Sequence, residues 1–201
     1  MISFNQPMNV YLYKISDADN KYSNLFKRYI LLKETGLQDI QFEYGPYGKP
    51  YVNSSGYTNL HFNISHSGDY FVGAVSLDCF IGIDIEQIKP VEFDCIEYFM
   101  SEQEIIQFHG FPLKEDKLDY FYTIWTLKEA YSKMIGMGLN MNLTKVNFLL
   151  ENQQFQSILG DVFCHSMIVD NNYRLSLISS KKKNIRVVNI TENLLIKEAD
   201  K

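Results

Sequence analysis

The segment Phe80–Glu86 constrains the fold most, because apolar and acidic side chains alternate along it. Ile83 and Ile85 alternate there with Asp84 and Glu86. Successive side chains of a strand point to opposite faces, so a strand here buries the isoleucines and presents both carboxylates on one face. Two neighbouring like charges need a cation or a proton, and Mg²⁺ binds one or two carboxylates while leaving room for phosphate oxygens. The alternative is a solvated acidic strand end.

Length and composition narrow the class of protein. A chain of 201 residues suits one compact unit or two closely packed halves. Its hydrophobic content of 46% and aromatic content of 14% are typical of a globular protein and not of a disordered one. The net charge of −5 argues against broad nucleic-acid binding.

No secretory signal is recognisable in Met1–Val10, and no run of about 18 apolar residues follows. We therefore expect a cytoplasmic protein that does not cross a membrane. Cys79, Cys95 and Cys164 are widely spaced and form no CxxC pair, so neither a disulfide framework nor a zinc site is indicated.

The first third of the chain predicts one strand and one helix. Asn9–Ile15 alternates as a strand does, and the helix that follows is capped by Asp17 or Asp19 and ends at Gly36. Gly45–Pro50 contains two glycines and two prolines, so it is expected to be a loop.

The middle of the chain predicts short strands and then helices. Ser101 is a helix cap before a short helix that reaches Phe108, and a long helix spans about Lys114–Ile135. An antiparallel meander is expected from three apolar runs, Leu60–Ser65, Tyr70–Ser76 and Phe80–Glu86.

The last third is expected to be mainly β. Asp170–Asn172 is a plausible hairpin turn. The expected strands are Lys145–Glu151, Phe163–Val169, Tyr173–Ser179 and Ile185–Ile190. The predicted order along the chain is one strand, one helix, several strands, and then helices and strands. This order is typical of an α+β fold and not of a regular βα alternation.

The long helix carries a polar extension of its apolar stripe. Trp125, Glu129 and Lys133 follow one another at a spacing of four. One interpretation of Glu129 and Lys133 is an ordinary helix ion pair, worth about 0.3–0.5 kcal/mol. Alternatively they lie where the buried face of the helix meets a cleft.

Two further polar blocks are candidates for binding. Lys49, between Gly48 and Pro50, either faces an anion or is a solvated loop lysine. In the Asn63–Ser67 block, residues 63, 65 and 67 share one face of a strand. His66 takes the other face unless the strand ends there. Adjacent serine and histidine are not evidence for a catalytic serine.

The order of five blocks resembles the 4′-phosphopantetheinyl transferases of the surfactin-synthetase-activating type. The blocks are Tyr47–Pro50, Phe62–Gly68, Ile81–Glu86 with Lys89 and Pro90, Phe99–Glu104, and Trp125–Leu139. They lie in the family's order over roughly Gln38–Leu139. The C-terminal β segment is similar in layout only, and the first 35 residues match weakly.

The resemblance implies transfer of 4′-phosphopantetheine from coenzyme A to a serine of an acyl or peptidyl carrier protein. The reaction depends on Mg²⁺ and releases adenosine 3′,5′-bisphosphate. The implied fold is α+β, with two pseudo-symmetric halves, 1–82 and 83–201, that form one compact monomer around the cofactor cleft.

The resemblance also implies roles for individual residues. Metal binding falls to Asp84, Glu86 and Glu129. Cofactor binding falls to Lys49, Ser65, His66, Lys133 and, at the place of the family's N-terminal arginines, Arg28. Catalysis falls to Lys133 and to a carboxylate that takes the serine proton, with Glu129 the first candidate and Glu104 the second.

Two other classes of function remain open. One is a non-catalytic coenzyme A or carrier-protein binding module of the same fold. Such a module has no need of Asp84, Glu86 and Glu129 together. The other is a different Mg²⁺ phosphotransferase or a nuclease, and the negative net charge speaks against the nuclease.

Overall fold

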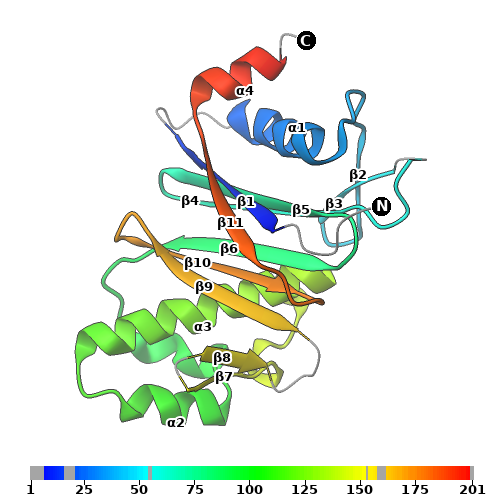
Figure 1. Ribbon diagram of the computed structural model, residues 1–201. Helices are drawn as coiled ribbons and strands as arrows, with labels where there is room; N and C mark the ends of the chain where they lie inside the picture. Colours follow the sequence, from blue (N-terminus) through cyan, green and yellow to red (C-terminus); the bar gives the residue numbers. More distant parts are fainter. Residues whose placement is uncertain (1–6, 16–20, 54–55, 153, 158–161, 200–201) are drawn as a thin grey trace.

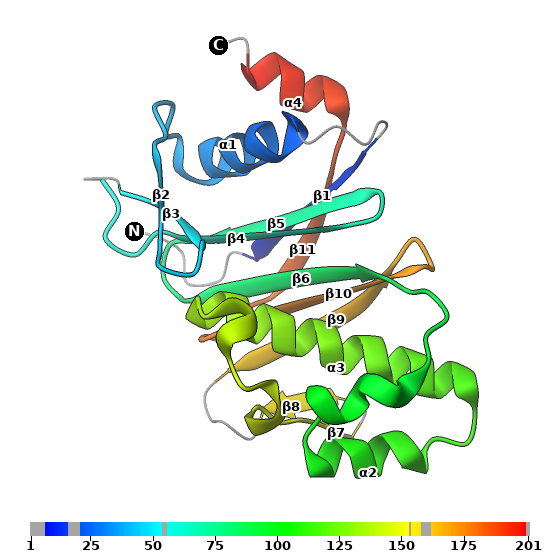
Figure 2. The ribbon, with the colours of Figure 1, turned by 180° about the vertical axis from the view of Figure 1, so that it is seen from behind.

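Two stacked β-sheets form the centre of the fold, and helices cover their outer faces (Figures 1 and 2). The computed structural model describes residues 7–15, 21–53, 56–152, 154–157 and 162–199. The observed mixture of helices and mainly antiparallel strands confirms the α+β class. The expected caps Asp17 and Asp19 lie outside the described residues.

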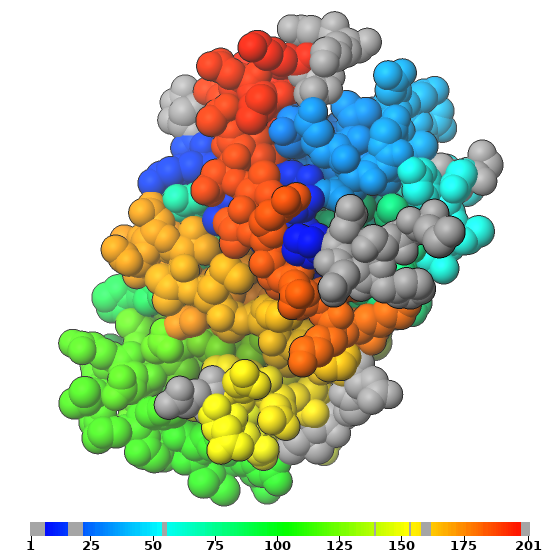
Figure 3. Space-filling view, viewed as in Figure 1, coloured from blue at the N-terminus to red at the C-terminus, as the bar shows by residue number. Residues whose placement is uncertain are grey.

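The first sheet has the strand order β11-β1-β5-β4. Its strands are β1 (Met8–Lys14), β4 (His61–Ser67), β5 (Tyr70–Ser76) and β11 (Ile185–Ile190). β1 is antiparallel to β5 and parallel to β11. Helix α1 (Lys21–Thr35) packs on its outer face through Phe26 and Ile30, and α4 (Glu192–Ala199) lies beside α1. The space-filling view shows the C-terminal segment crossing one face of the molecule (Figure 3).

The second sheet has the order β6-β10-β9, and all its pairs are antiparallel. It consists of β6 (Ile81–Gln87), β9 (Phe163–Val169) and β10 (Tyr173–Ser179). Asp170 and Asn171 have φ values of 48° and 59°, the left-handed conformation that tight hairpin turns require, which confirms the turn expected there. Helix α3 (Lys114–Ile135) covers the outer face of this sheet (Figure 2).

Smaller elements complete both layers. Ser101 and Glu104 form a capping box that begins α2, as the sequence predicts. The helical elements are η1 (Phe93–Tyr98), α2 (Glu102–Gly110), η2 (Gly138–Asn140) and η3 (Leu143–Lys145). The short strands are β2 (Phe42–Tyr44), β3 (Pro50–Val52), β7 (Phe148–Glu151) and β8 (Gln154–Ser157). The predicted loop 45–50 joins β2 to β3, except that Pro50 is already the first residue of β3.

The core between the two sheets explains the alternation in β6. Ile83 and Ile85 are fully buried there. They belong to the same cluster as Val10 of β1, Val72 of β5 and Leu175 of β10. The prediction that the isoleucines enter the core is confirmed, and Asp84 and Glu86 therefore emerge on the α3 side of the strand.

The predicted meander is wrong in its third strand. β4 and β5 form the expected hairpin, but β6 pairs with β10 and belongs to the second sheet. The isoleucines of β6 can then face the first sheet across the shared core.

The expected division of the chain at residues 82 and 83 falls inside β6. β11 and α4 come late in the sequence but lie with the first sheet. In the part of the chain that the structure describes, no helix has the length and apolar character that a membrane crossing requires.

Candidate active site

The candidate site lies where α3 crosses the acidic end of β6. The predicted stripe on α3 turns Glu129 and Lys133 toward this strand. Both sit next to a closely packed helix–strand contact, so they are partly buried. The four-residue spacing on α3 and the two-residue alternation on β6 turn the polar side chains of the two elements toward each other. The two motifs are more than 40 residues apart in the sequence.

Lys133, Asp84 and Ser65 form a three-membered network. The Lys133 ammonium donates to Asp84 Oδ1 at 2.6 Å and to Ser65 Oγ at 2.7 Å. The Ser65 hydroxyl in turn donates to Asp84 Oδ1 at 2.7 Å. Asp84 is only 3% exposed, and burial raises the pKa of its carboxyl, while Lys133 and Ser65 oppose that increase.

Glu129 shares this acidic environment without a hydrogen bond at one of its oxygens. Its Oε1 atom and Asp84 Oδ2 are both buried and lack a hydrogen-bond partner in the structure. Burial raises the pKa of Glu129, the charges on Asp84 and Glu86 raise it further, and Lys133 lowers it. The site therefore holds more negative charge than Lys133 alone offsets.

Such a donor set fits a hard divalent cation, since unpartnered carboxylate oxygens are what Mg²⁺ binds. Among the residues that the structure describes, no three side chains with carboxylate, imidazole or thiol groups lie close enough together to form a metal site. Lys133 provides the positive charge at Asp84 instead.

Glu86 is held from the neighbouring sheet. Ser67 Oγ donates to Glu86 Oε2 at 2.8 Å and accepts from the backbone N–H of Gln87 at 3.1 Å. The sequence correctly predicts that Asn63, Ser65 and Ser67 share one face of β4, but it assigns no role to Ser67. The matching two-residue spacing of the serines and of the acidic residues was the signal that could have identified it.

The other predicted binding residues, Lys49, His66 and Arg28, lie outside this network. Lys49 Nζ donates to the carbonyl of Met134, in the last turn of α3 beyond Lys133, and burial lowers its pKa. His66 is on the opposite face of β4, where its exposed ring packs edge-on against Phe71. Arg28 is exposed on α1 and lies over the Phe42 ring, and no interaction described for it reaches the acidic residues.

Glu104 belongs to a different environment. It is fully buried and accepts hydrogen bonds from the backbone N–H groups of Ser101 and Phe148. Lys128 Nζ lies 2.6 Å from its Oε2 atom and also donates to three backbone carbonyls. These contacts give Glu104 a structural role, and no described contact joins it to the acidic network around Asp84.

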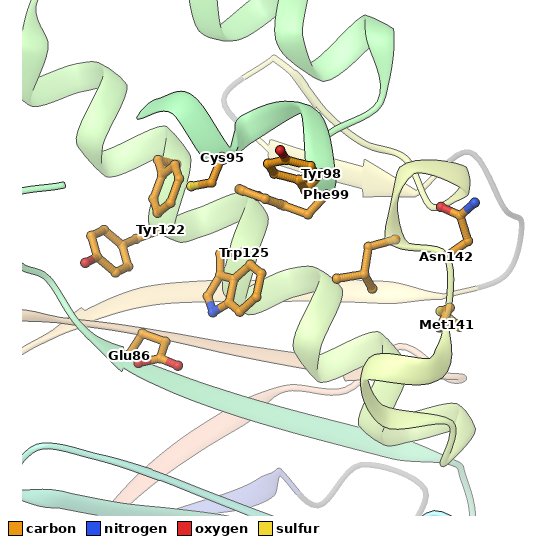
Figure 4. Close-up of a pocket in the computed structure, with 10 residues that line it drawn as sticks. Glu86, Cys95, Tyr98, Phe99, Tyr122, Trp125, Met141 and Asn142 are labelled. Carbon is orange, nitrogen blue, oxygen red and sulfur yellow. The ribbon is translucent and has the colours of Figure 1, made fainter. Parts of the chain in front are cut away.

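An aromatic pocket adjoins the acidic residues (Figure 4). It has a volume of about 590 Å³, and Glu86 lies on its β6 side. Its aromatic lining comes from the end of η1, from the residue that follows it and from α3, with Tyr98, Phe99, Phe121, Tyr122 and Trp125. The sequence placed Trp125 on the stripe of the long helix and Phe99 in one of the five blocks, but it did not predict an aromatic pocket.

Comparisons with known proteins show which family this chain is similar to. The family model of the 4′-phosphopantetheinyl transferase superfamily matches residues 80–180, which is half of the chain. The 4′-phosphopantetheinyl transferase ffp of Bacillus subtilis is 33% identical over 151 residues, covering 71% of this chain and 64% of that protein. The 4′-phosphopantetheinyl transferase psf-1 of Bacillus pumilus is 40% identical over 108 residues, covering 54% of this chain and 45% of that protein.

Among solved structures, the holo-[acyl-carrier-protein] synthase of Thermotoga maritima superimposes on this chain with a TM-score of 0.43. The two sequences are 23% identical in the matched part, which covers 52% of this chain and 65% of that protein. The chain spans 64% of the length of the ffp transferase and 45% of the length of the psf-1 transferase. The match to the family model includes β6 and α3, the two elements that carry the acidic network. The chain belongs to the 4′-phosphopantetheinyl transferase superfamily.

Proposed function

We propose that this protein transfers 4′-phosphopantetheine from coenzyme A to a serine of an acyl or peptidyl carrier protein. The reaction depends on Mg²⁺ and releases adenosine 3′,5′-bisphosphate. Family membership supports the reaction class. The observation that carries the proposal for this chain is the pair of unpartnered buried oxygens on Asp84 and Glu129 beside Lys133.

The metal would be held by Asp84, Glu86 and Glu129. When bound, Mg²⁺ offsets the charge of the pyrophosphate and of the departing oxygen. The three carboxylates supply the hard oxygen donors. Burial raises the pKa of both Asp84 and Glu129, and repulsion from neighbouring carboxylates raises both further, so a bound cation would relieve part of this cost.

Lys133 is proposed to bind the pyrophosphate. Two of its three N–H groups donate to Asp84 and Ser65, which leaves one for a phosphate oxygen. Its charge stabilises the negative charge that develops on the bridging oxygen. Lys49, whose ammonium donates to the carbonyl of Met134 in the last turn of α3, is proposed to bind the nucleotide end of coenzyme A together with Ser65. His66 and Arg28 remain weaker candidates because no described contact joins them to the network.

Glu129 is proposed as the general base. A carboxylate that reaches the incoming hydroxyl, directly or through a water, can accept its proton. The carrier serine oxygen forms a bond to the phosphorus that bears the pantetheine arm, and the bond from that phosphorus to the bridging oxygen breaks. The serine proton moves to Glu129, and adenosine 3′,5′-bisphosphate leaves.

A monomer is the proposed active form. Ser65 and Ser67 come from the first sheet, while Asp84, Glu86 and Lys133 come from the second sheet and its helix. Both sides of the site are thus supplied by one chain.

The test is a transfer assay with mass measurement. Purified protein is incubated with coenzyme A, Mg²⁺ and apo-carrier proteins from fatty-acid, polyketide and peptide pathways, and each carrier is weighed. We expect one phosphopantetheine on the carrier, and none on a carrier whose acceptor serine is alanine. Coenzyme A binding without any mass gain would instead identify a non-catalytic binding module.

A further inference from the structure

Strands β4 and β6 meet at the boundary between the two sheets, where side chains of β4 bond to β6. The two strands belong to different hydrogen-bonded sheets. Asn63 Oδ1 accepts from the backbone N–H of Ile83 at 2.9 Å, and Ser67 Oγ accepts from that of Gln87 at 3.1 Å. Between them, Ser65 reaches a side chain of β6. Alternate residues of β4 therefore join the edge of β6 at three successive points.

The two serines match the two acidic residues in register. Ser65 Oγ donates to Asp84 Oδ1 at 2.7 Å, and Ser67 Oγ donates to Glu86 Oε2 at 2.8 Å. Each serine is 19 positions before its carboxylate. The two separations are equal because a step of two residues along β4 matches a step of two residues in the same direction along β6. One strand thus provides one hydroxyl to each of the two carboxylates on β6.

The orientation of the Ser67 hydroxyl is determined by its two partners. A serine has one O–H to donate. Because Ser67 Oγ accepts from the N–H of Gln87, its own proton is directed to Glu86 Oε2. Glu86 is only half-buried and lies on the β6 side of the aromatic pocket (Figure 4). Without this bond, its carboxylate could rotate among several conformers at the edge of the pocket.

We propose that Ser67 is a positioning residue for Glu86, holding one carboxylate oxygen so that the other is presented to the metal. This inference rests on the proposed function, in which Glu86 helps to bind Mg²⁺. Groups that hydrogen-bond to a metal ligand orient it, and their loss typically lowers metal affinity by about 10–100-fold. Ser67 acts through Glu86 and makes no contact with the substrate in this proposal.

The experiment compares the Ser67→Ala variant with wild type and with a matched control. Ser179 is also the last residue of its strand, and its hydroxyl donates to a backbone carbonyl, that of Lys181. Ser179→Ala therefore removes a comparable hydrogen bond that does not involve a carboxylate. Affinity is measured by electron paramagnetic resonance with Mn²⁺ as the probe for the Mg²⁺ site, at saturating coenzyme A, and melting temperatures are recorded.

We expect Ser67→Ala to bind Mn²⁺ about 10-fold or more weakly. Ser67→Thr, which keeps the hydroxyl, should restore the affinity, and Ser179→Ala should leave it unchanged. The Mg²⁺ concentration at half-maximal transfer should rise in parallel for Ser67→Ala. If Ser67→Ala does not fold, Ser67→Cys retains the size with a much weaker donor and should show the same loss of affinity.

The outcomes separate this inference from the proposed function. If wild type transfers phosphopantetheine and a folded Ser67→Ala or Ser67→Cys variant binds Mn²⁺ as tightly as wild type does, the positioning role is refuted and the function stands. If wild type neither binds Mn²⁺ nor modifies any carrier, both proposals fail.

Discussion

Gly82 of β6 lies directly beneath the carbonyl oxygen of Ala130 in α3. A Cβ atom built on Gly82 would stand 1.8 Å from that oxygen and 2.6 Å from the backbone nitrogen of Met134. Both neighbouring groups are helix backbone and cannot rotate away. The absence of a side chain at this position therefore allows α3 to approach β6, and the same approach brings Lys133 to Asp84.

We predict that Gly82→Ala separates α3 from β6 and destabilises the protein by about 3 kcal/mol or more, the upper end of overpacking penalties. The melting temperature should fall by roughly 6–12 °C for a chain of this size. Gly110→Ala is the control, since a Cβ there meets nothing within 4 Å. Thermal unfolding of both variants checks the prediction, and equal melting temperatures would contradict it.

Asp84→Asn should lower transfer by about 100- to 1,000-fold, the usual cost of losing one group that stabilises transition-state charge. The fold should persist because asparagine has the same size and no charge to bury. Asp78→Asn is the control, because Asp78 pairs with Lys181 and Lys183 away from β6 and α3. Near-normal transfer by a folded Asp84→Asn variant would exclude Asp84 from the metal site.

Stability should depend on pH through Glu129. Its folded pKa is raised, so the folded state binds more protons than the unfolded state from about pH 4 up to that folded pKa. Stability is therefore lost as the pH rises through this window. Glu129→Gln has no such charge, and we expect it to melt about 2–4 °C above wild type at pH 8, which corresponds to ~1 kcal/mol.

The advantage of Glu129→Gln over wild type should disappear near pH 4, where Glu129 is protonated in both states. Addition of Mg²⁺ with coenzyme A at pH 8 should raise the melting temperature of wild type more than that of the variant, since a ligand that binds only the folded state stabilises it. An advantage that is the same at pH 4 and pH 8 would show that the higher melting temperature of Glu129→Gln does not come from removing the charge of Glu129.

Lys128 is expected to be a structural residue despite its place beside Glu129. It is fully buried and bonds to Glu104 and to the carbonyls of Phe99, Leu143 and Val146. Lys128→Met leaves the Glu104 charge buried without a counter-ion, so we predict a loss of about 3–5 kcal/mol. Lys14→Met, which breaks the exposed pair with Asp170, should leave the stability nearly unchanged, because solvent screens an exposed ion pair.

Chemical denaturation measures both costs. The double variant Lys128→Met with Glu104→Gln should lose less than the sum of its single variants, because the two residues interact directly. A strictly additive result would mean that the pair does not contribute as a unit.

Glu104→Gln separates the structural assignment from a catalytic one. Assayed below its melting temperature and corrected for the folded fraction, it should transfer phosphopantetheine at a rate within about threefold of wild type. The reason is that Glu104 is enclosed by backbone donors and Lys128. A loss as large as that of Asp84→Asn would restore Glu104 as a candidate base.

Several elements could be predicted from the sequence because their signals are local. The strands Tyr70–Ser76 and Tyr173–Ser179 and the helix Lys114–Ile135 have the predicted bounds. Ser101 and Glu104 cap α2 as expected, since a capping box needs only four neighbouring residues. The two-residue repeat of β6 likewise predicts which side chains are buried.

Other features depend on residues far apart in the chain and could not be predicted in this way. The pairing of β6 with β10 involves a strand that begins 86 positions after Gln87, and a periodic pattern carries no information about which strand pairs with which. The helix α4 and the strand β8 were missed, and both are short.

The sequence by itself determined the local structure, the two carboxylates on one face of a strand, and the resemblance that leads to the proposed reaction. Only the tertiary structure distinguished a buried ion pair of Glu104 with Lys128 from the acidic network around Asp84, and joined Ser67 to Glu86. The physical reason is that hydrogen bonds and ion pairs act over a few ångströms in space. Which side chains come that close is decided by how α3 and β4 pack on β6.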